Sequence, residues 1–455
     1  APRILNDRGA GIEANYRYLT NTKSENYLDV IFFPTDKQYK KDFTSKEDQR
    51  WAFRLKEKRQ FLNFTTYIDW SKSSDSMMLL DLPSSITNIA DQRDHYLNQT
   101  FSMNLFSKNL SVSLTRDGYQ SLNPFINNGL VKKPGIQIEY LNNGSKFSFF
   151  SNLDYSNFDI DKTINQFLSS NSIPETGKRS MAEIGAEVLY DLKYFNIAIN
   201  GSTLHKKYNL DEKNSKSISS SIPSVKINIS TILKKLSVSG ISLIKPEFVF
   251  QKTNYKDQSL DPIFDLHQRN SGNLNILRNE YFFGKDRVPD TEFLAAKLNW
   301  QKRTKNNHKF AFQLIKKHEL EASKIINNML RTPMGKDSQI GSKLSFENNN
   351  LKTYVAANYS QKRNSLNYGE MGLQINRPEM SMRISRNFQR NIPLLDFKNE
   401  LDYSELSIVR LLPSGYKIIG GISKDLVSKK NIETYFGFGF ENCCLAFKIY
   451  ASDKR

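Results

Sequence analysis

Apolar and polar residues alternate with a period of two along most of this chain. The alternation is clearest in residues 12–18, 147–155, 296–301, 380–385 and 432–441. In the third of these segments Lys297, Asn299 and Gln301 take the polar positions, and the positions between them are apolar. A period of two is the signature of β-strands with one apolar and one polar face. No long stretch shows the helical period, although short helical turns within connections are compatible with the pattern. The pattern predicts an all-β protein.

The length of the alternating segments favours a membrane barrel over a soluble sandwich. Many segments keep the alternation for about nine residues or more, whereas strands of soluble proteins peak at about 5–6 residues and tilted membrane-spanning strands need about 9–11. The spacing predicts roughly 20 strands. No Pro/Gly/Ser-rich linker divides the 455 residues. We therefore expect residues 1–455 to form a single domain, a large antiparallel up-and-down transmembrane β-barrel that is incomplete at both ends.

The expected connections are of two kinds. Residues Asn142–Ser145 contain Asn-Gly and predict a tight turn. Longer polar connections are expected at residues 161–178, 206–223 and 252–272. Short turns on one rim and long loops on the other are typical of outer-membrane barrels.

Charge and hydropathy narrow the possible environments. The net charge is +18, which raises nucleic acids, membrane surfaces and anionic lipids as partners. The basic residues are spread along the chain and accompany no nucleic-acid-binding motif, so nucleic-acid binding is not expected. No apolar run reaches the roughly 18 residues of a membrane helix. The first residues show no signal peptide, as in a cytosolic chain, a mature chain or a piece of a longer one.

Nothing in the sequence favours catalysis. The five histidines are scattered without metal-ligand spacing, and no nucleophile elbow, P-loop or dinucleotide-binding fingerprint is present. We expect no enzymatic activity, no metal and no cofactor.

Cys443 and Cys444 are the only cysteines. Neighbouring cysteines rarely bond to each other, because the required geometry strains the intervening peptide. Either their partners lie on polypeptide beyond this chain, or they are two reduced thiols.

Several short motifs together resemble one protein family. They are Pro2-Arg3 with Arg8-Gly9 and Arg17-Tyr18-Leu19, Phe33-Pro-Thr-Asp-Lys37, Arg50-Trp-Ala-Phe53, Tyr119-Gln-Ser-Leu-Asn-Pro124, Lys245-Pro-Glu247, Tyr255-Lys-Asp-Gln258 with Pro262-Ile-Phe-Asp265, Gly284-Lys-Asp-Arg-Val288 with Asp290, and Glu441-Asn-Cys-Cys-Leu-Ala-Phe-Lys448. In this order they resemble the lipopolysaccharide-assembly outer-membrane protein family, LptD, also called organic solvent tolerance proteins. Leu445 stands where the family usually has Trp. The family-motif loop residues are Asp257, Gln258, Pro262, Asp265, Asp286 and Arg287.

The resemblance implies a translocon that inserts lipopolysaccharide into the outer leaflet of the Gram-negative outer membrane. It implies a plug lipoprotein, LptE, inside the barrel and a periplasmic Lpt bridge that delivers lipopolysaccharide through an N-terminal domain absent from this chain. It also implies that Cys443 and Cys444 form disulfides with cysteines in that absent region, in an oxidising compartment. The family's gate forms between the first and last barrel strands. We expect those strands to be absent from this chain, so the gate cannot be located in it.

Four basic residues are expected to face the barrel lumen: Arg17, Lys297, Arg383 and Lys448. On the lipid face at mid-membrane each would cost about 2–4 kcal/mol, whereas in a wet lumen it stays hydrated and can meet phosphate groups. Any porin lumen is also charged, so a general porin or receptor barrel remains an alternative. A soluble multi-sandwich adhesin is a further one, but it would need repeated domains that this chain lacks.

Overall fold

The structure is a computed structural model that describes most of the chain. The described residues are 2–19, 25–44, 47–82, 87, 89, 96–122, 129–160, 175–211, 217–268, 275–277, 282–329, 335–390, 401–441 and 446–454. They fall into two compact units, which are described separately. Unit 1 comprises Ala1–Ala186, Ser202–Ser221 and Ser259–Phe264, and unit 2 comprises Glu187–Gly201, Ile222–Gln258 and Asp265–Arg455.

Strands dominate both units. In chain order they are β1 (Pro2–Leu5), β2 (Gly9–Leu19), β3 (Glu25–Phe33), β4 (Arg50–Phe61), β5 (Phe64–Ser73), β6 (Tyr96–Phe106), β7 (Leu110–Ser121), β8 (Leu130–Asn143), β9 (Phe147–Ile160), β10 (Gly177–Asp191), β11 (Asn196–Leu210), β12 (Ser217–Ser230), β13 (Leu233–Ser237), β14 (Gly240–Thr253), β15 (His267–Gln268), β16 (Phe282–Phe283), β17 (Thr291–Thr304), β18 (Lys309–Glu321), β19 (Ser338–Glu347), β20 (Leu351–Ser360), β21 (Ser365–Arg377), β22 (Met380–Gln389), β23 (Leu401–Leu411), β24 (Tyr416–Asp425), β25 (Lys430–Glu441) and β26 (Ala446–Lys454). The helical elements are α1 (Lys37–Asp42), α2 (Met78–Asp81), η2 (Asn275–Leu277), α3 (Lys324–Met329) and η3 (Pro413–Gly415). Among the described residues no helix is long and apolar enough to cross a membrane.

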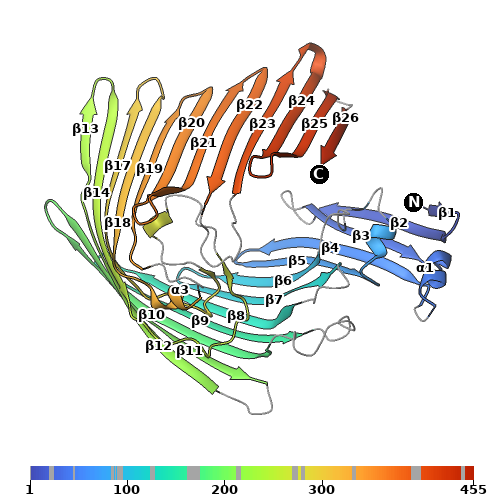
Figure 1. Ribbon diagram of the computed structural model, residues 1–455, viewed down its shortest axis with the longest axis horizontal. Helices are drawn as coiled ribbons and strands as arrows, with labels where there is room; N and C mark the ends of the chain where they lie inside the picture. Colours follow the sequence, from blue (N-terminus) through green and yellow to red (C-terminus); the bar gives the residue numbers. More distant parts are fainter. Residues whose placement is uncertain are drawn as a thin grey trace. The chain divides into compact units, whose positions relative to one another are not determined.

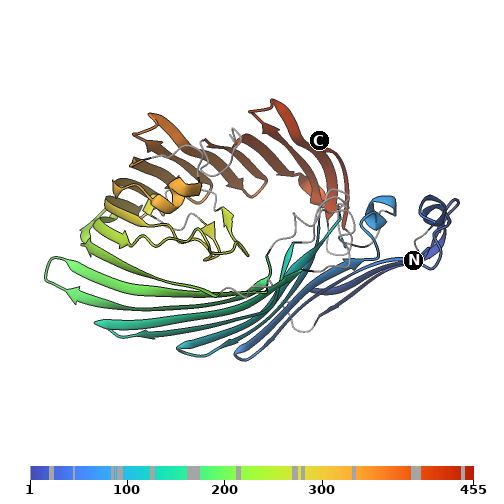
Figure 2. The same ribbon diagram turned by 60° about the horizontal axis from the view of Figure 1, so that its bottom comes forward.

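Hydrogen bonds join 24 of these strands in one antiparallel sheet, and β15 pairs with β16 in a small second sheet. Consecutive strands are paired, as between β4 and β5 in unit 1 and between β17 and β18 in unit 2. Within unit 1 the strands from β2 to β9 lie side by side in one curved layer (Figure 1 and Figure 2). Within unit 2 the strands from β17 to β26 do the same. The predicted all-β, up-and-down fold and its approximate strand number are confirmed.

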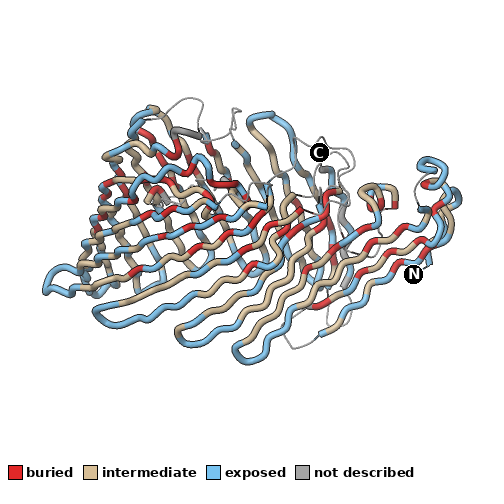
Figure 3. Tube along the Cα trace, turned by 90° about the horizontal axis from the view of Figure 1, so that it is seen from below, coloured by how far each residue is buried: buried red, intermediate tan, exposed pale blue. Residues whose placement is uncertain are grey.

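Burial alternates along the strands. Figure 3 shows buried and exposed residues following one another along the backbone of single strands. In β11, for example, Leu204, Lys206 and Tyr208 are buried and the residues between them are exposed. This alternation is the structural counterpart of the period of two in the sequence.

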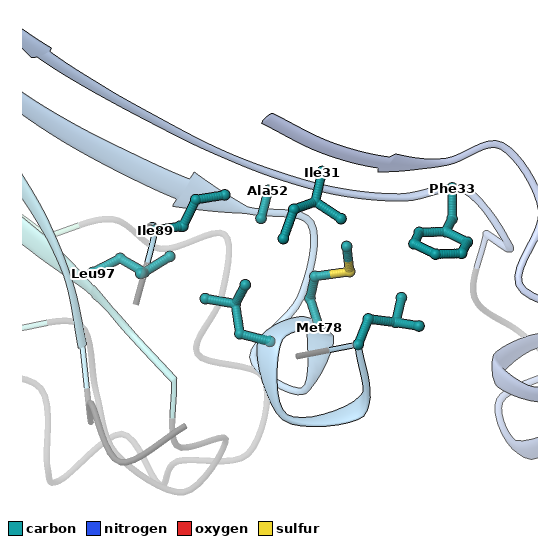
Figure 4. Packing of buried hydrophobic residues seen from close by; sticks show 8 residues of the cluster. Ile31, Phe33, Ala52, Met78, Ile89 and Leu97 are labelled. Atoms are coloured by element: carbon teal, nitrogen blue, oxygen red, sulfur yellow. The ribbon is translucent and has the colours of Figure 1, made fainter. Parts of the chain in front are cut away.

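Each unit has a small apolar cluster where a connection covers the sheet. In unit 1, Met78, Leu79 and Leu82 at α2 belong to a buried cluster with Ile31 and neighbouring strand residues. Figure 4 shows Met78 facing Ile31 and Phe33. In unit 2, Leu277 of η2 packs against Val249, Phe293 and Ala295 of β14 and β17. The connections are therefore part of the packed structure.

Two expected connections need correction. The polar stretch predicted as a long loop from Lys206 to Pro223 is mostly strand, because β11 continues to Leu210 and β12 begins at Ser217. The long connection expected from Lys252 begins after Thr253 and extends to residue 290. The predicted turn at Asn142–Ser145 is confirmed, since β8 ends at Asn143 and the backbone N–H of Gly144 donates to the carbonyl of Phe147.

Candidate functional site

Strand β17 separates its polar and apolar residues onto opposite faces. Lys297 and Asn299 share a face with the buried Phe293. The opposite face carries Leu294, which is 50% exposed, and Leu298, which is 36% exposed. Exposed aliphatic side chains on one face of a long strand are typical of contact with lipid or with another apolar surface.

The polar face of β17 is linked to its neighbours by a row of hydrogen bonds. Lys297 Nζ lies 2.8 Å from Glu247 Oε2 on β14, and Lys245 Nζ lies 2.8 Å from the other oxygen of the same carboxylate. Asn299 donates to Glu247 at 3.2 Å and accepts from Gln313 of β18 at 2.7 Å. Five strand residues in unit 2 thus form a connected polar band with two cations and one anion.

The structure describes the side chains of two of the other three predicted basic residues, Arg17 and Arg383. Arg17 of β2 donates from Nε to Asn15 Oδ1 at 2.9 Å, and on the opposite face Tyr16 is 64% exposed. Arg383 of β22 is exposed and alternates with Met382. Lys448 is paired with Gly439 in the register of β25 and β26, but its side chain lies outside the described residues. That these residues face a lumen stays a prediction.

The adjacent cysteines also lie outside the described part of the chain. Cys443 and Cys444 fall between β25 and β26, and their predicted disulfides stay predictions.

Three of the family-motif loop residues hold the connection between β14 and β17 together in unit 2. The side-chain amide of Gln258 makes two hydrogen bonds with the backbone of Val288, one donated at 2.7 Å and one accepted at 2.9 Å. Asp286, which is fully buried, accepts from the backbone N–H of Asp265 at 2.9 Å. Gly284 has φ +83°, and a Cβ there would lie 2.4 Å from the carbonyl oxygen of Asp265, so only glycine fits this turn.

The remaining motif loop residues differ in burial. Asp257 is exposed, and Pro262 is buried in unit 1. Arg287 donates to the carbonyl of Asp286 at 3.2 Å. Pro262 and Arg287 are thus part of the folded connection, whereas Asp257 lies on its surface.

Residues Ser259–Phe264 of the same connection pack onto strands of unit 1. Lys206 Nζ of β11 lies 2.7 Å from Asp261 Oδ2, and both side chains are buried. The Phe264 ring stacks on Phe158 of β9 at 4.5 Å, and the Arg179 guanidinium lies 5.0 Å from the Phe158 ring. This segment covers the face of β9–β11 that carries the buried Lys206.

A buried network of ion pairs lies where β3 ends and β4 begins in unit 1. The fully buried Arg50 lies 3.0 Å from Asp36, 2.8 Å from Asp75 and 2.9 Å from Asp81. Arg8 reaches Asp36 at 2.8 Å, and the Arg50 guanidinium lies 4.2 Å from the ring of Tyr39. One buried arginine therefore organises three carboxylates.

Asp36 is also the N-cap of α1. Its carboxylate accepts from the backbone N–H of Tyr39 at 3.0 Å. Burial by itself would raise the pKa of Asp36, but the Tyr39 N–H and the two arginines outweigh it and hold the pKa below its usual value. Asp36 therefore remains ionised within the network.

Sequence reasoning missed the residues that anchor these connections. Arg8, Asp36 and Arg50 belong to the motifs that carried the resemblance, and that was the available signal. The sequence carried no signal for the pairing of Lys206 with Asp261, because 55 positions of the chain separate the two residues. Among the described residues no group of three or more His, Cys, Asp or Glu side chains could hold a metal ion.

Curated proteins that match this chain include several named LPS-assembly protein LptD. The LPS-assembly protein LptD of Pseudoalteromonas atlantica is 22% identical over 472 residues, covering 99% of this chain and 58% of that protein. LptD of Paraburkholderia xenovorans is 24% identical over 306 residues, covering 65% of this chain and 37% of that protein. The chain thus spans about half the length of the curated relatives that it matches.

Similar solved structures are more distant. The ferric-catecholate import receptor Fiu from E. coli K12 matches with a TM-score of 0.42 and 6% identity, over 93% of this chain and 75% of that chain. The copper transporter OprC matches with a TM-score of 0.42 and 8% identity, over 97% of this chain and 76% of that chain. Likeness at this level carries no argument about function.

The family comparison covers most of the strand-forming region. The family described as "LptD: LPS transport system D" matches residues 48–407, from the motif at the start of β4 into β23. That range includes the connection between β14 and β17 and the polar band on β14, β17 and β18. The chain belongs to the LptD family.

Proposed function

We propose that this chain is the barrel portion of an outer-membrane translocon that inserts lipopolysaccharide into the outer leaflet of a Gram-negative envelope. Membership of the LptD family over residues 48–407 is the observation that carries the proposal. The physical arrangement supports it, since a long antiparallel sheet with an exposed aliphatic face suits a bilayer. The role is transport, with no catalytic step.

The polar band supplies chemistry that suits the cargo. Lipopolysaccharide has an anionic sugar head and an apolar tail, so its transfer needs a hydrated, cation-bearing surface for the head. Lys297 and Lys245 share one carboxylate, Glu247, which leaves the band with net positive charge. Ammonium groups form charge-assisted hydrogen bonds to phosphate oxygens.

The proposed partners rest on the resemblance to the family. We propose a plug lipoprotein, LptE, within the barrel, and a periplasmic Lpt bridge that delivers lipopolysaccharide through a further domain. The chain's coverage of 58% of a full-length relative leaves room for that domain in the whole protein.

Complementation tests the proposal. The full-length gene would be expressed in a Gram-negative strain depleted of its own LptD, and newly made lipopolysaccharide at the cell surface would be measured by its accessibility to an external antibody. The proposal predicts restored surface lipopolysaccharide. Lys297→Gln should slow its appearance, and Leu298→Met on the opposite face of β17 should not.

A general porin or receptor barrel is the competing function. It predicts no rescue of surface lipopolysaccharide and free passage of small hydrophilic solutes through the full-length protein in liposomes.

A further inference from the structure

An aliphatic groove with a basic end lies on the exposed face of the sheet in unit 1. It has a volume of about 340 Å³ and is lined by Ile136, Ile138, Leu153, Tyr155, His205 and Lys207, among others. Leu153 is 41% exposed and Tyr155 is 38% exposed. His205 and Lys207 alternate with the buried Lys206 along β11. They therefore lie on the face of β11 opposite to the one that Ser259–Phe264 covers.

Unit 2 contains a second groove of the same kind. It has a volume of about 360 Å³ and is lined by Ile227, Phe248, Leu294, Ala296, Lys316 and His318, among others. Phe248 is 60% exposed. Lys316 and His318 alternate with the buried Lys317 of β18, as His205 and Lys207 alternate with Lys206.

The basic ends of the two grooves share their chemistry. In each, a lysine and a histidine two positions apart project from one strand. In each, the histidine Nδ1 is hydrogen-bonded to a serine on the next strand: His205 to Ser221 at 2.9 Å, and His318 to Ser338 at 2.6 Å. When the serine hydroxyl donates to Nδ1, the neutral imidazole carries its proton on Nε2 and can donate it to a ligand.

The lysines are available to an anion. Within the part of the chain that the structure describes, neither Lys207 nor Lys316 forms an ion pair with a carboxylate. Glu292 of β17 lies 2.9 Å from Lys252 of β14. Exposed basic residues on an otherwise aliphatic face need a reason, because at mid-membrane each would cost about 2–4 kcal/mol.

The position along the strands supplies that reason. His205 and Lys207 lie near the end of β11, beside the start of β10, where the long connection of residues 161–176 enters. Lys316 and His318 lie near the end of β18, which is followed by the connection of residues 322–337 that contains α3. Long connections of outer-membrane barrels face the outside, so both basic ends are expected at the outer headgroup level.

We propose that each groove binds a phosphorylated glycolipid of the outer leaflet, with an acyl chain along the aliphatic residues and a phosphate against the Lys–His pair. This inference rests on the proposed function, which sets the membrane and the leaflet. It goes beyond that function by assigning one lipopolysaccharide-binding site to the exposed apolar face of the strands in each unit.

The test uses the full-length protein in nanodiscs that contain phosphatidylethanolamine, phosphatidylglycerol and rough-type lipopolysaccharide. A benzophenone amino acid is placed at Ile138 for the first groove and at Phe248 for the second, and the lipid adducts are identified by mass spectrometry. Lys207→Gln and Lys316→Gln remove the charges, and Lys207→Arg and Lys316→Arg restore them. Lys235→Gln is the matched control, since Lys235 is exposed and paired with Ser242 on the same face at the opposite, short-turn end of β14.

We expect lipopolysaccharide adducts at both probes, lowered about tenfold by the glutamine variants and restored by arginine, with Lys235→Gln unchanged. Phospholipid adducts in place of lipopolysaccharide, lipopolysaccharide adducts insensitive to both glutamine variants, or no adduct at either probe would overturn the inference. The complementation assay separates the two proposals. Restored surface lipopolysaccharide with unlabelled grooves rejects the grooves alone, and failed complementation rejects the proposed function.

Discussion

Lys206 and Asp261 form a buried ion pair of 2.7 Å, with side-chain exposures of 0% and 2%, although 55 positions separate them in the chain. The pair joins β11 to a six-residue segment of the connection between β14 and β17, within unit 1. Phe264 at the end of that segment stacks on Phe158 and lies 6.0 Å from Tyr208. Charge and stacking together hold this segment against the sheet.

Removing one partner of this pair should be more damaging than removing both. Lys206→Met leaves the Asp261 carboxylate buried without its cation, which typically costs about 3–5 kcal/mol of unfolding free energy. The double variant Lys206→Met with Asp261→Leu should recover most of that loss. The measurement is urea unfolding of the full-length protein in detergent, together with protease cleavage within residues 254–290.

Lys226→Met is the control for the loss of a lysine from an exposed strand position. If the single Lys206 variant unfolds like the wild type and its connection resists protease, the pair does not hold the segment.

Acid should weaken the network around Arg50. The pKa of Asp36 is held below its usual value, so the contribution of Asp36 to stability is complete above about pH 4 and is lost as the pH falls through that lowered value. Asp36→Asn should therefore destabilise the protein at neutral pH by about 1–3 kcal/mol and flatten the acid part of its stability profile. Thermal unfolding between about pH 2.5 and 7 measures both effects.

The control is Asp42→Asn, since Asp42 is an exposed carboxylate in the same connection. If the stability of Asp36→Asn falls in acid as that of the wild type does, a group other than Asp36 accounts for the loss of stability in acid.

The cysteines should form long-range disulfides in the intact protein. Cys443 and Cys444 follow β25 in the sequence, and the family resemblance implies bridges from them to an upstream domain. Mass mapping of the non-reduced full-length protein should find each cysteine linked to a distant one. A bond between Cys443 and Cys444, or two free thiols in mature protein, would refute this expectation.

The strands could be predicted from the sequence because their signal is local. Alternation around Lys297 and around Met382 required only neighbouring residues, and β17 and β22 form where it predicted. The boundary of β11 was misjudged, because residues 206–210 are polar enough to resemble a loop. Lys206 remains in the strand since Asp261 neutralises it.

The candidate site was harder to predict because it depends on contacts between distant segments. Gln258 and Asp286 were selected through family resemblance, and the structure shows why such residues are needed: both fold the connection through hydrogen bonds to backbone groups. Arg50 lay in a quoted motif, but its three carboxylate partners could be identified only once the chain was folded.

The central claim is that lipopolysaccharide passes along the polar face of these strands, and site-specific photo-crosslinking in growing cells tests it most directly. Probes in the full-length protein replace Lys297 and Arg383 on the polar positions, and Leu298 and Met382 on the adjacent apolar positions. After a pulse of labelled lipopolysaccharide, capture is predicted at Lys297 and Arg383 during transport, with bulk membrane lipid captured at Leu298 and Met382. If the polar positions never capture lipopolysaccharide while small hydrophilic solutes pass freely through the protein, the claim is contradicted and the barrel is a general porin.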